Sequence, residues 1–257
     1  MFVKRALYYS YEKLLEKEVR KGTTPTHIGI ILDGNRRFAR EMGFDDVTMG
    51  HQEGARKLDG VLQWCSDLGI KIVTIWVLST ENIRRDKSEI EGLLKVIEEK
   101  IIELSRSRVI KKNGFRIKIL GNFDVLPDTL KEAIKNTEEY TKDNKRHILN
   151  IAISYGGREE IVEAVRKAIR ERRSKSADEL ADSITIEDIT NHLYTNGIPD
   201  PDLIIRTSGE IRLSGFLLWQ SVYSEFYFCD ALWPAFRKID FLRAIRSYQH
   251  RGRRFGR

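Results

Sequence analysis

Short runs of apolar residues, each about the length of a β-strand, recur along the 257-residue chain. In the run at 71–78 the apolar positions are nearly continuous, which is typical of a strand in a parallel sheet covered on both faces. The runs lie at 26–32, 71–78, 115–120, 148–153, 202–205 and 225–229. We therefore predict six strands.

Amphipathic stretches with apolar residues at helical spacing separate these runs. They predict helices at 5–21, 35–42, 50–68, 87–112, 127–141, 157–173, 186–193 and 239–249, with a turn at 178–183. Alternating strands and helices predict an α/β fold, an open, mostly parallel β-sheet flanked by helices. Because no linker or low-complexity tract interrupts the pattern, we predict a single domain over 1–257.

Polar segments follow three of the predicted strands, at 33–37, 79–85 and 206–214. Ligands of such sheets bind beyond the carboxyl ends of the strands. Arg36 and Arg37 stand at a helix start, where positive charge is unfavourable unless an anion lies above it. A carboxylate beside that anion, here Asp33, suits Mg²⁺. The segments therefore predict a phosphate or diphosphate site.

Each of these features also has a simpler interpretation. Asp33 could be only a helix N-cap, His51 a cap or surface residue, and Glu225 a solvent-facing acid. The pair at 156–157 (Gly-Gly) could be a phosphate turn, although we favour a tight strand-to-helix connection. The basic tail at 250–257 could be a solvated end, a nucleic-acid contact or a phosphate clamp.

Composition narrows the class of protein only partly. A net charge of +7 and a pI near 9.3 allow nucleic acid, anionic lipid or phosphorylated small molecules as partners. The P-loop and the GxGxxG signature are both missing from the sequence. Two cysteines and the lack of a long apolar run predict a cytoplasmic protein. The amphipathic helix within 1–24 could dock on the core, on a partner subunit or on a membrane surface.

At these motifs the chain resembles the cis-prenyltransferase family, that of undecaprenyl and dehydrodolichyl diphosphate synthases. The resemblance extends from Thr26 to the C-terminus, with motifs agreeing in order and spacing. These motifs are HIGIILDGNRRFA (27–39), 79–85, NIAISYGGR (150–158), DLIIRTSGEIRLS (202–214), FLLWQ (216–220) and LWP (232–234).

The resemblance implies a transferase that condenses isopentenyl diphosphate with an allylic prenyl diphosphate to build a long-chain cis-polyprenyl diphosphate, a glycosyl carrier lipid precursor. It implies Mg²⁺ at Asp33 and Glu225, and catalytic roles for Asp33 and Asn82. Residues implied at the allylic diphosphate are Gly34, Asn35, Arg36, Arg37, Phe38 and His51. Further substrate contacts are implied for Ser79, Thr80, Glu81 and Arg85, and the isopentenyl diphosphate site for Arg206, Arg212 and Ser214.

The resemblance also implies a homodimer, in which the Arg254-x-Gly256 tail reaches a partner's active site. The family's apolar tunnel could have the apolar face of the helix at 87–112 as one wall, although that face could equally be ordinary core packing. Peripheral membrane contact would come through the lipid product. Three departures from the family are Asp45 and Asp46 where an arginine is common, Ile83 for an aromatic residue, and Ile211 for a histidine.

Other functions fit less well. A non-catalytic partner subunit would lack the aspartate-bearing loop, which is present here at Asp33. A nucleic-acid-binding protein would need a basic face with stacking aromatics, whereas these arginines gather at strand ends. We therefore expect no nucleic-acid partner. Within enzymes, the alternative is a relative that makes short products or uses an unusual prenyl acceptor.

Overall fold

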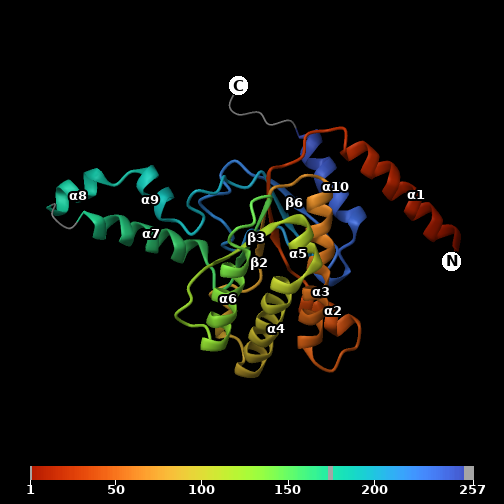
Figure 1. Cartoon of the computed structure of the whole chain (residues 1–257), viewed down its shortest axis with the longest axis horizontal. Coiled ribbons are helices and arrows are strands. Elements are labelled where there is room, and N and C mark those ends of the chain that lie inside the picture. The colour runs from red at the N-terminus through yellow and green to blue at the C-terminus, as the bar shows by residue number, and fades with distance from the viewer. Residues whose placement is uncertain (1, 173–175, 252–257) are drawn as a thin grey trace.

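The computed structural model describes residues 2–172 and 176–251, and it contains all six predicted strands (Figure 1). Their bounds are β1 His27–Ile31, β2 Ile72–Trp76, β3 Phe115–Leu120, β4 His147–Ala152, β5 Leu203–Arg206 and β6 Glu225–Phe228. They form one sheet in the order β3-β4-β2-β1-β5-β6, and each neighbouring pair is parallel. The prediction of an open parallel sheet is confirmed.

Helices occupy the segments between the strands. The α-helices are α1 Phe2–Val19, α2 Asn35–Glu41, α3 Val47–Asp67, α4 Lys87–Arg106, α5 Arg108–Asn113, α6 Asp128–Thr141, α7 Gly157–Glu171, α8 Ala177–Ser183, α9 Ile186–His192 and α10 Lys238–His250. Two short 3₁₀ helices are η1 Asn82–Arg84 and η2 Trp233–Ala235.

Capping side chains explain three differences between the predicted and the observed helices. α3 begins at Val47 rather than 50, since the Asp46 carboxylate accepts the backbone N–H of Thr48 at 2.8 Å. The helix predicted over 87–112 breaks at Ser107, whose extended backbone ends α4 and whose hydroxyl caps α5. The predicted turn at 178–183 is the helix α8, which a capping box from Ser176 begins.

Two apolar clusters cover the two faces of the sheet. The larger one joins alternate strand residues such as Ile30 and Ile75 to apolar side chains of α1, α3, α4, α6 and α10. The smaller one packs Ile31 and Trp76 against Tyr155 and Phe216 on the other face. Apolar side chains therefore cover both faces of the sheet, as the nearly continuous apolar pattern of the strands requires.

The helix α1 and the helices α7, α8 and α9 extend beyond the sheet on opposite sides (Figure 1). Leu15 and Val19 of α1 belong to the larger cluster, and Lys238 of α10 pairs with Glu16 at 2.8 Å. The second half of this helix therefore docks on the core, whereas Tyr8, Tyr11 and Leu14, expected on its apolar face, are 53%, 37% and 67% exposed.

Within the described residues, no helix is both long enough and apolar enough to cross a membrane. The Arg254-x-Gly256 motif of the tail lies outside the described residues.

Candidate functional site

The junction after β1 positions Asp33 at the carboxyl edge of the sheet. Gly34 has a φ of 105°, in the left-handed region that favours glycine, and α2 begins at the next residue. Gly34 is the N-cap of α2, with no side-chain cap hydrogen bond. The N-cap interpretation of Asp33 is therefore wrong, and its carboxylate is available for other contacts.

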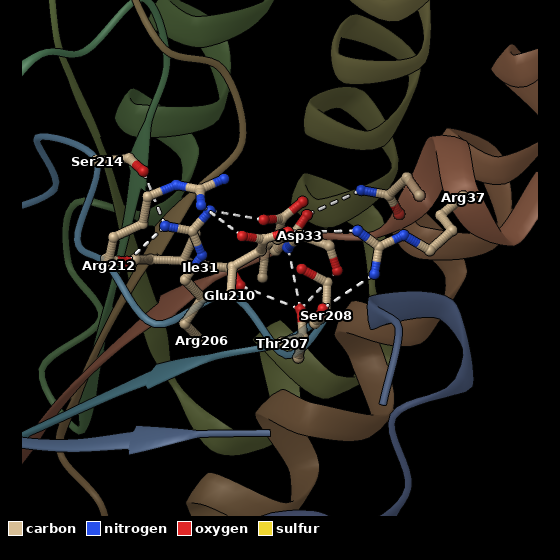
Figure 2. Close-up of polar contacts among 11 residues, drawn as sticks. Ile31, Asp33, Arg37, Arg206, Thr207, Ser208, Glu210, Arg212 and Ser214 are labelled. Atoms are coloured by element: carbon tan, nitrogen blue, oxygen red, sulfur yellow. Dashed lines mark hydrogen bonds and ion pairs between the residues drawn. The ribbon is translucent and has the colours of Figure 1, made fainter. Parts of the chain in front are cut away.

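The segment after β5 holds Asp33 in place. The backbone N–H of Asp33 donates to Thr207 Oγ1 at 3.0 Å, and the Thr207 hydroxyl donates to the Asp33 carbonyl at 2.6 Å. Arg206 Nη2 donates to Asp33 Oδ2 at 2.7 Å (Figure 2). The Arg206 side chain is only 5% exposed and that of Asp33 36%. A buried guanidinium thus presents the carboxylate to the opening above the sheet.

Arg206 also organises the loop that follows β5. Its Nη1 donates to Ser214 Oγ at 2.8 Å and to the backbone carbonyl of Arg212. Glu210 pairs with Arg212 and lies 3.4 Å from Arg37 Nη2, so this one acid joins the loop to α2. In Figure 2, Arg206 and Arg212 lie on one side of Asp33 and Arg37 on the other. Asp33 therefore stands between two cationic flanks.

The α2 flank continues to α3 and α4. Glu89 Oε1 lies 2.9 Å from Arg85 Nη1 and 3.4 Å from Arg36 Nε. Burial, with the positive charges of Arg85 and Arg36, lowers the pKa of His51 to about 4. The ring is therefore neutral at pH 7 and offers one donor and one acceptor nitrogen.

These groups line a cleft of about 460 Å³ at the carboxyl edge of the sheet. Its lining includes six arginines but only two acids. The arginines are Arg36, Arg37, Arg40, Arg85, Arg206 and Arg212, and the acids are Asp33 and Glu81. The cleft is therefore strongly cationic and suited to polyanions such as diphosphates.

Unpartnered polar atoms gather in this cleft. Seven buried side-chain polar atoms lack a hydrogen-bond partner across the part of the chain that the structure describes. Four of them belong to cleft residues, namely Asn35 Oδ1, Arg36 Nε, His51 Nε2 and Arg206 Nε, although Arg36 Nε also lies 3.4 Å from Glu89 Oε1 in an ion pair. Buried polar atoms are normally paired, so this concentration is the expected signature of groups that await a ligand.

The structure brings most of the predicted site residues together in this cleft. Its lining contains every predicted residue except three, Phe38, Thr80 and Glu225. Phe38 packs edge-to-face on Phe44, with ring centroids 6.2 Å apart. The Thr80 hydroxyl lies against Gly156. A Cβ added to that glycine would lie 2.7 Å from Thr80 Oγ1.

Glu225 lies at the opposite end of the sheet from Asp33. It pairs in register with Leu203 at the start of β5, whereas Ile31, just before Asp33, pairs with the last residue of β5. Its carboxylate lies 3.2 Å from Arg251 Nη1. Within one chain the length of the strands therefore separates the two acids, and the Mg²⁺ role of Glu225 stays a prediction.

Two of the three departures from the family have a structural account. Asp46 serves as the N-cap of α3, and Ile83 packs against the larger apolar cluster. Ile211 is 78% exposed and touches nothing that explains it. Arg40, which the sequence interpretation missed, lines the cleft and adds a further cation to its α2 side. The signal was its spacing, one helical turn after Arg36.

Glu89 and Glu210 were also missed. Each pairs with two arginines of the cleft rim. The i,i+4 spacing of Arg85 and Glu89 could have indicated one of these pairs, whereas the pairs of Arg36 with Glu89 and of Arg37 with Glu210 join residues far apart in the chain.

Behind the cleft an apolar cavity of about 60 Å³ runs between α3, α4 and the sheet. Leu32, Asn35, His51, Val77 and Leu93 line both spaces, so the cavity opens from the cationic cleft. Beyond this mouth the walls are mainly aliphatic, with Leu58, Val96, Ile97, Ile101, Leu104 and Ile151 among them. The predicted apolar face of α4 is thus both core and cavity wall.

Known proteins share this architecture. A family model described as "Putative undecaprenyl diphosphate synthase" matches residues 31–256. An isoprenyl transferase of Thermus thermophilus is 52% identical over 255 residues, which cover 98% of this chain and 97% of that protein. A (2Z,6E)-farnesyl diphosphate synthase of Thermobifida fusca is 48% identical over 252 residues, 97% of each chain.

A solved structure agrees with this grouping. Lavandulyl diphosphate synthase from Lavandula x intermedia, in complex with dimethylallyl diphosphate, superposes with a TM-score of 0.82 at 38% identity. The match covers 93% of this chain and all of that one. With its parallel sheet, its cationic cleft and its apolar cavity, the chain belongs to the undecaprenyl diphosphate synthase family and is an isoprenyl transferase that elongates cis-prenyl chains.

Proposed function

We propose that the enzyme condenses isopentenyl diphosphate with an allylic prenyl diphosphate, and repeats the step to build a long-chain cis-polyprenyl diphosphate. The observation that carries this proposal is the position of Asp33 between two arginine flanks, in a cleft that opens into an apolar cavity. Two flanks suit two diphosphates, and the cavity suits the hydrocarbon of one of them.

The allylic diphosphate belongs on the α2 side. The backbone N–H groups at the start of this seven-residue helix, together with Arg36, Arg37 and Arg40, can hold its charge. Its prenyl chain would enter the cavity past His51 and Leu93. His51, neutral before binding, would gain a proton more readily beside a diphosphate, because a nearby negative charge raises a histidine pKa.

Isopentenyl diphosphate belongs on the β5 side. Arg206, Arg212 and Ser214 lie together there, and Arg206 is already fixed by its bonds to Asp33 and Ser214. Such pre-organised donors hold a second reactant close to the first, which removes much of the entropic barrier to their reaction.

The donor set also fits Mg²⁺. Arg206 engages one oxygen of the partly exposed Asp33 carboxylate, and Mg²⁺ is commonly held by one or two carboxylates plus substrate phosphate oxygens. Within residues 2–172 and 176–251 no cluster of three metal-ligating side chains exists, so most ligands would come from the substrate. Bound there, the ion would supply further positive charge against the departing diphosphate.

In each round the allylic C–O bond breaks, and diphosphate leaves with the bonding electrons. The double bond of isopentenyl diphosphate forms the new C–C bond, and one proton is lost to leave a new double bond. The arginines stabilise the leaving diphosphate as its charge develops. Asn82 carries an amide, which is no base near neutral pH, so we assign it to substrate orientation. A phosphate oxygen, whose second pKa is near 6, can take the proton.

We further propose a homodimer in the cytoplasm, with membrane contact only through the lipid product. Glu225 could reach an Asp33 site only from a second copy of the chain. Two buried, unpaired cysteines, Cys65 and Cys229, support a reducing compartment.

Short products remain the second candidate. The Thermobifida fusca relative is named for a farnesyl product, whereas the family model is named for undecaprenyl diphosphate.

One experiment tests both candidates. The purified enzyme is incubated with Mg²⁺, isopentenyl diphosphate and a ten-, fifteen- or twenty-carbon allylic primer in turn, and the products are weighed by mass spectrometry. A series of masses rising by five-carbon units to a long product is expected. Termination after one or two additions would establish the short-product alternative, and unchanged primers would refute the proposed reaction.

A further inference from the structure

One charged side chain stands in the wall of the apolar cavity. Beyond the mouth residues, Lys100 of α4 is the charged member of an otherwise uncharged lining among the described residues. Its side chain is 8% exposed. A lysine is rarely buried unless it is paired, so its presence in this wall calls for a specific arrangement.

Lys100 lies deep in the cavity. Leu93, on the same helix, lines both the cleft and the cavity. Lys100 follows it by two helical turns, or about 10 Å along the axis at the usual helical rise. Leu104, one turn further, marks the inner end of the α4 lining. A chain that grows inward from the cleft therefore meets Lys100 before it reaches Leu104.

An ion pair with the neighbouring helix fixes this side chain. Lys100 Nζ pairs with Asp59 of α3 and lies 3.1 Å from Glu103 Oε1. Asp59 in turn accepts the Ser107 hydroxyl at 2.9 Å, at the break between α4 and α5. Glu103 is 62% exposed, so the ammonium points toward the outer side of the α3–α4 seam while its aliphatic stem faces the cavity.

The pairing resists displacement of the stem. Moving Lys100 aside would separate its ammonium from Asp59 within a largely buried setting, and breaking such a pair is strongly unfavourable. A hydrocarbon chain cannot compensate by contact with the ammonium, because it offers no hydrogen-bond acceptor. Aliphatic neighbours such as Ile97 and Leu104 could instead adjust to a passing chain.

We propose that Lys100, pinned across the α3–α4 seam by Asp59, limits the length of the product. The proposal rests on the proposed condensation step and sharpens its short-product candidate, because a stop about 10 Å beyond Leu93 leaves room for only a short chain. When the growing end reaches the Lys100 stem, a further addition would require either displacement of the ion pair or expulsion of the chain, and the product is released.

The test measures product length in the wild type and three variants with the ten-carbon primer and excess isopentenyl diphosphate, because a longer primer would already reach Lys100. Lys100→Ala opens the wall and is expected to lengthen the main product by at least one five-carbon unit. Lys100→Met keeps most of the side-chain volume but removes the ion pair with Asp59. Its flexible side chain should therefore allow a smaller increase in product length. Lys238→Met is the matched control, because Lys238 pairs with Glu16 at 2.8 Å far from the cavity.

The outcomes separate this proposal from the function on which it rests. Unchanged lengths in both folded Lys100 variants would overturn it, as would equal lengthening in Lys238→Met. A wild-type enzyme that adds no isopentenyl unit would count against the proposed function instead. Circular dichroism establishes that each variant is folded, and Lys100→Met retains a test if Lys100→Ala does not fold.

Discussion

Replacement of Asp33 by alanine should abolish most of the activity of the enzyme while leaving it folded. The change removes the carboxylate that accepts Arg206 Nη2 at 2.7 Å and leaves the backbone bonds to Thr207 in place. Arg206 keeps two partners, Ser214 Oγ and the Arg212 carbonyl. The variant therefore loses one contact of a site that remains largely assembled.

The expected loss of stability is modest. Removing one partner of a fully buried ion pair costs about 3–5 kcal/mol. Asp33 is 36% exposed, so water from the cleft can hydrate the Arg206 guanidinium, and about 1–2 kcal/mol is a better figure. For a protein of this size that lowers Tm by about 2–8 °C. The folded state should persist at assay temperature.

The expected loss of activity is much larger. Asp33 would act through the Mg²⁺ that it helps to hold, and loss of a group that stabilises the charge developing on the leaving diphosphate costs about 10²–10³ in rate. Asp33→Ala should therefore lower kcat by at least about 10²-fold. Asp33→Asn keeps the shape and an oxygen that accepts from Arg206, so it should be nearly as inactive and more stable than the alanine variant.

Turnover of labelled isopentenyl diphosphate and thermal unfolding by circular dichroism measure the two effects. Glu16→Ala is the control, because it breaks the pair with Lys238 at a distance from the cleft and should lose stability but not turnover. Near-normal turnover in Asp33→Ala would refute the reasoning, and so would complete unfolding in Asp33→Asn.

Three further predictions concern other parts of the molecule. Arg212→Ala should raise the KM for isopentenyl diphosphate at least about tenfold, because one charge-assisted contact is lost. The KM for the allylic substrate should be nearly unchanged. Equal increases in both KM values in steady-state kinetics would contradict the two-flank arrangement. Gly54→Ala should destabilise the protein by about 1–3 kcal/mol in urea unfolding, because the added Cβ would lie 2.2 Å from Asn35 Oδ1; wild-type stability would contradict the close packing. Burial lowers the pKa of His27 to about 4, so the unfolded state, with a histidine pKa near 6.5, takes up the proton first as the pH falls. The contribution of His27 to the free energy of unfolding should then fall between pH 6.5 and 4 by up to about 3 kcal/mol and be constant below that range. An NMR titration that places the folded pKa of His27 near 6.5 would contradict this.

The fold was largely predictable because each element carries its own signal. Six apolar runs predicted six strands, and the apolar periodicity predicted the helices to within a few residues. The misplaced boundaries depend on single capping side chains, Asp46 and Ser107, whose effect spacing does not reveal. The helix at 177–183 was missed because it is short and none of its residues is buried.

The cleft was predictable in composition but not in its contacts. Polar segments after three strands had to meet at one edge, because parallel strands bring their carboxyl ends together. The resemblance could not place Glu225 relative to Asp33, since strand register separates the two acids within one chain. It also treated Arg206 as part of a separate substrate site, whereas its bond to Asp33 couples the two flanks.

The sequence by itself determined which segments form strands, that those strands lie parallel, and that arginines and Asp33 gather at one edge of the sheet. These properties follow from local periodicity and from the direction of the chain. Only the tertiary structure decided which acid neutralises which arginine, where Glu225 lies, and that Lys100 stands in the wall of the apolar cavity. Such contacts join residues far apart in the chain, and their distances depend on how the helices pack on the sheet.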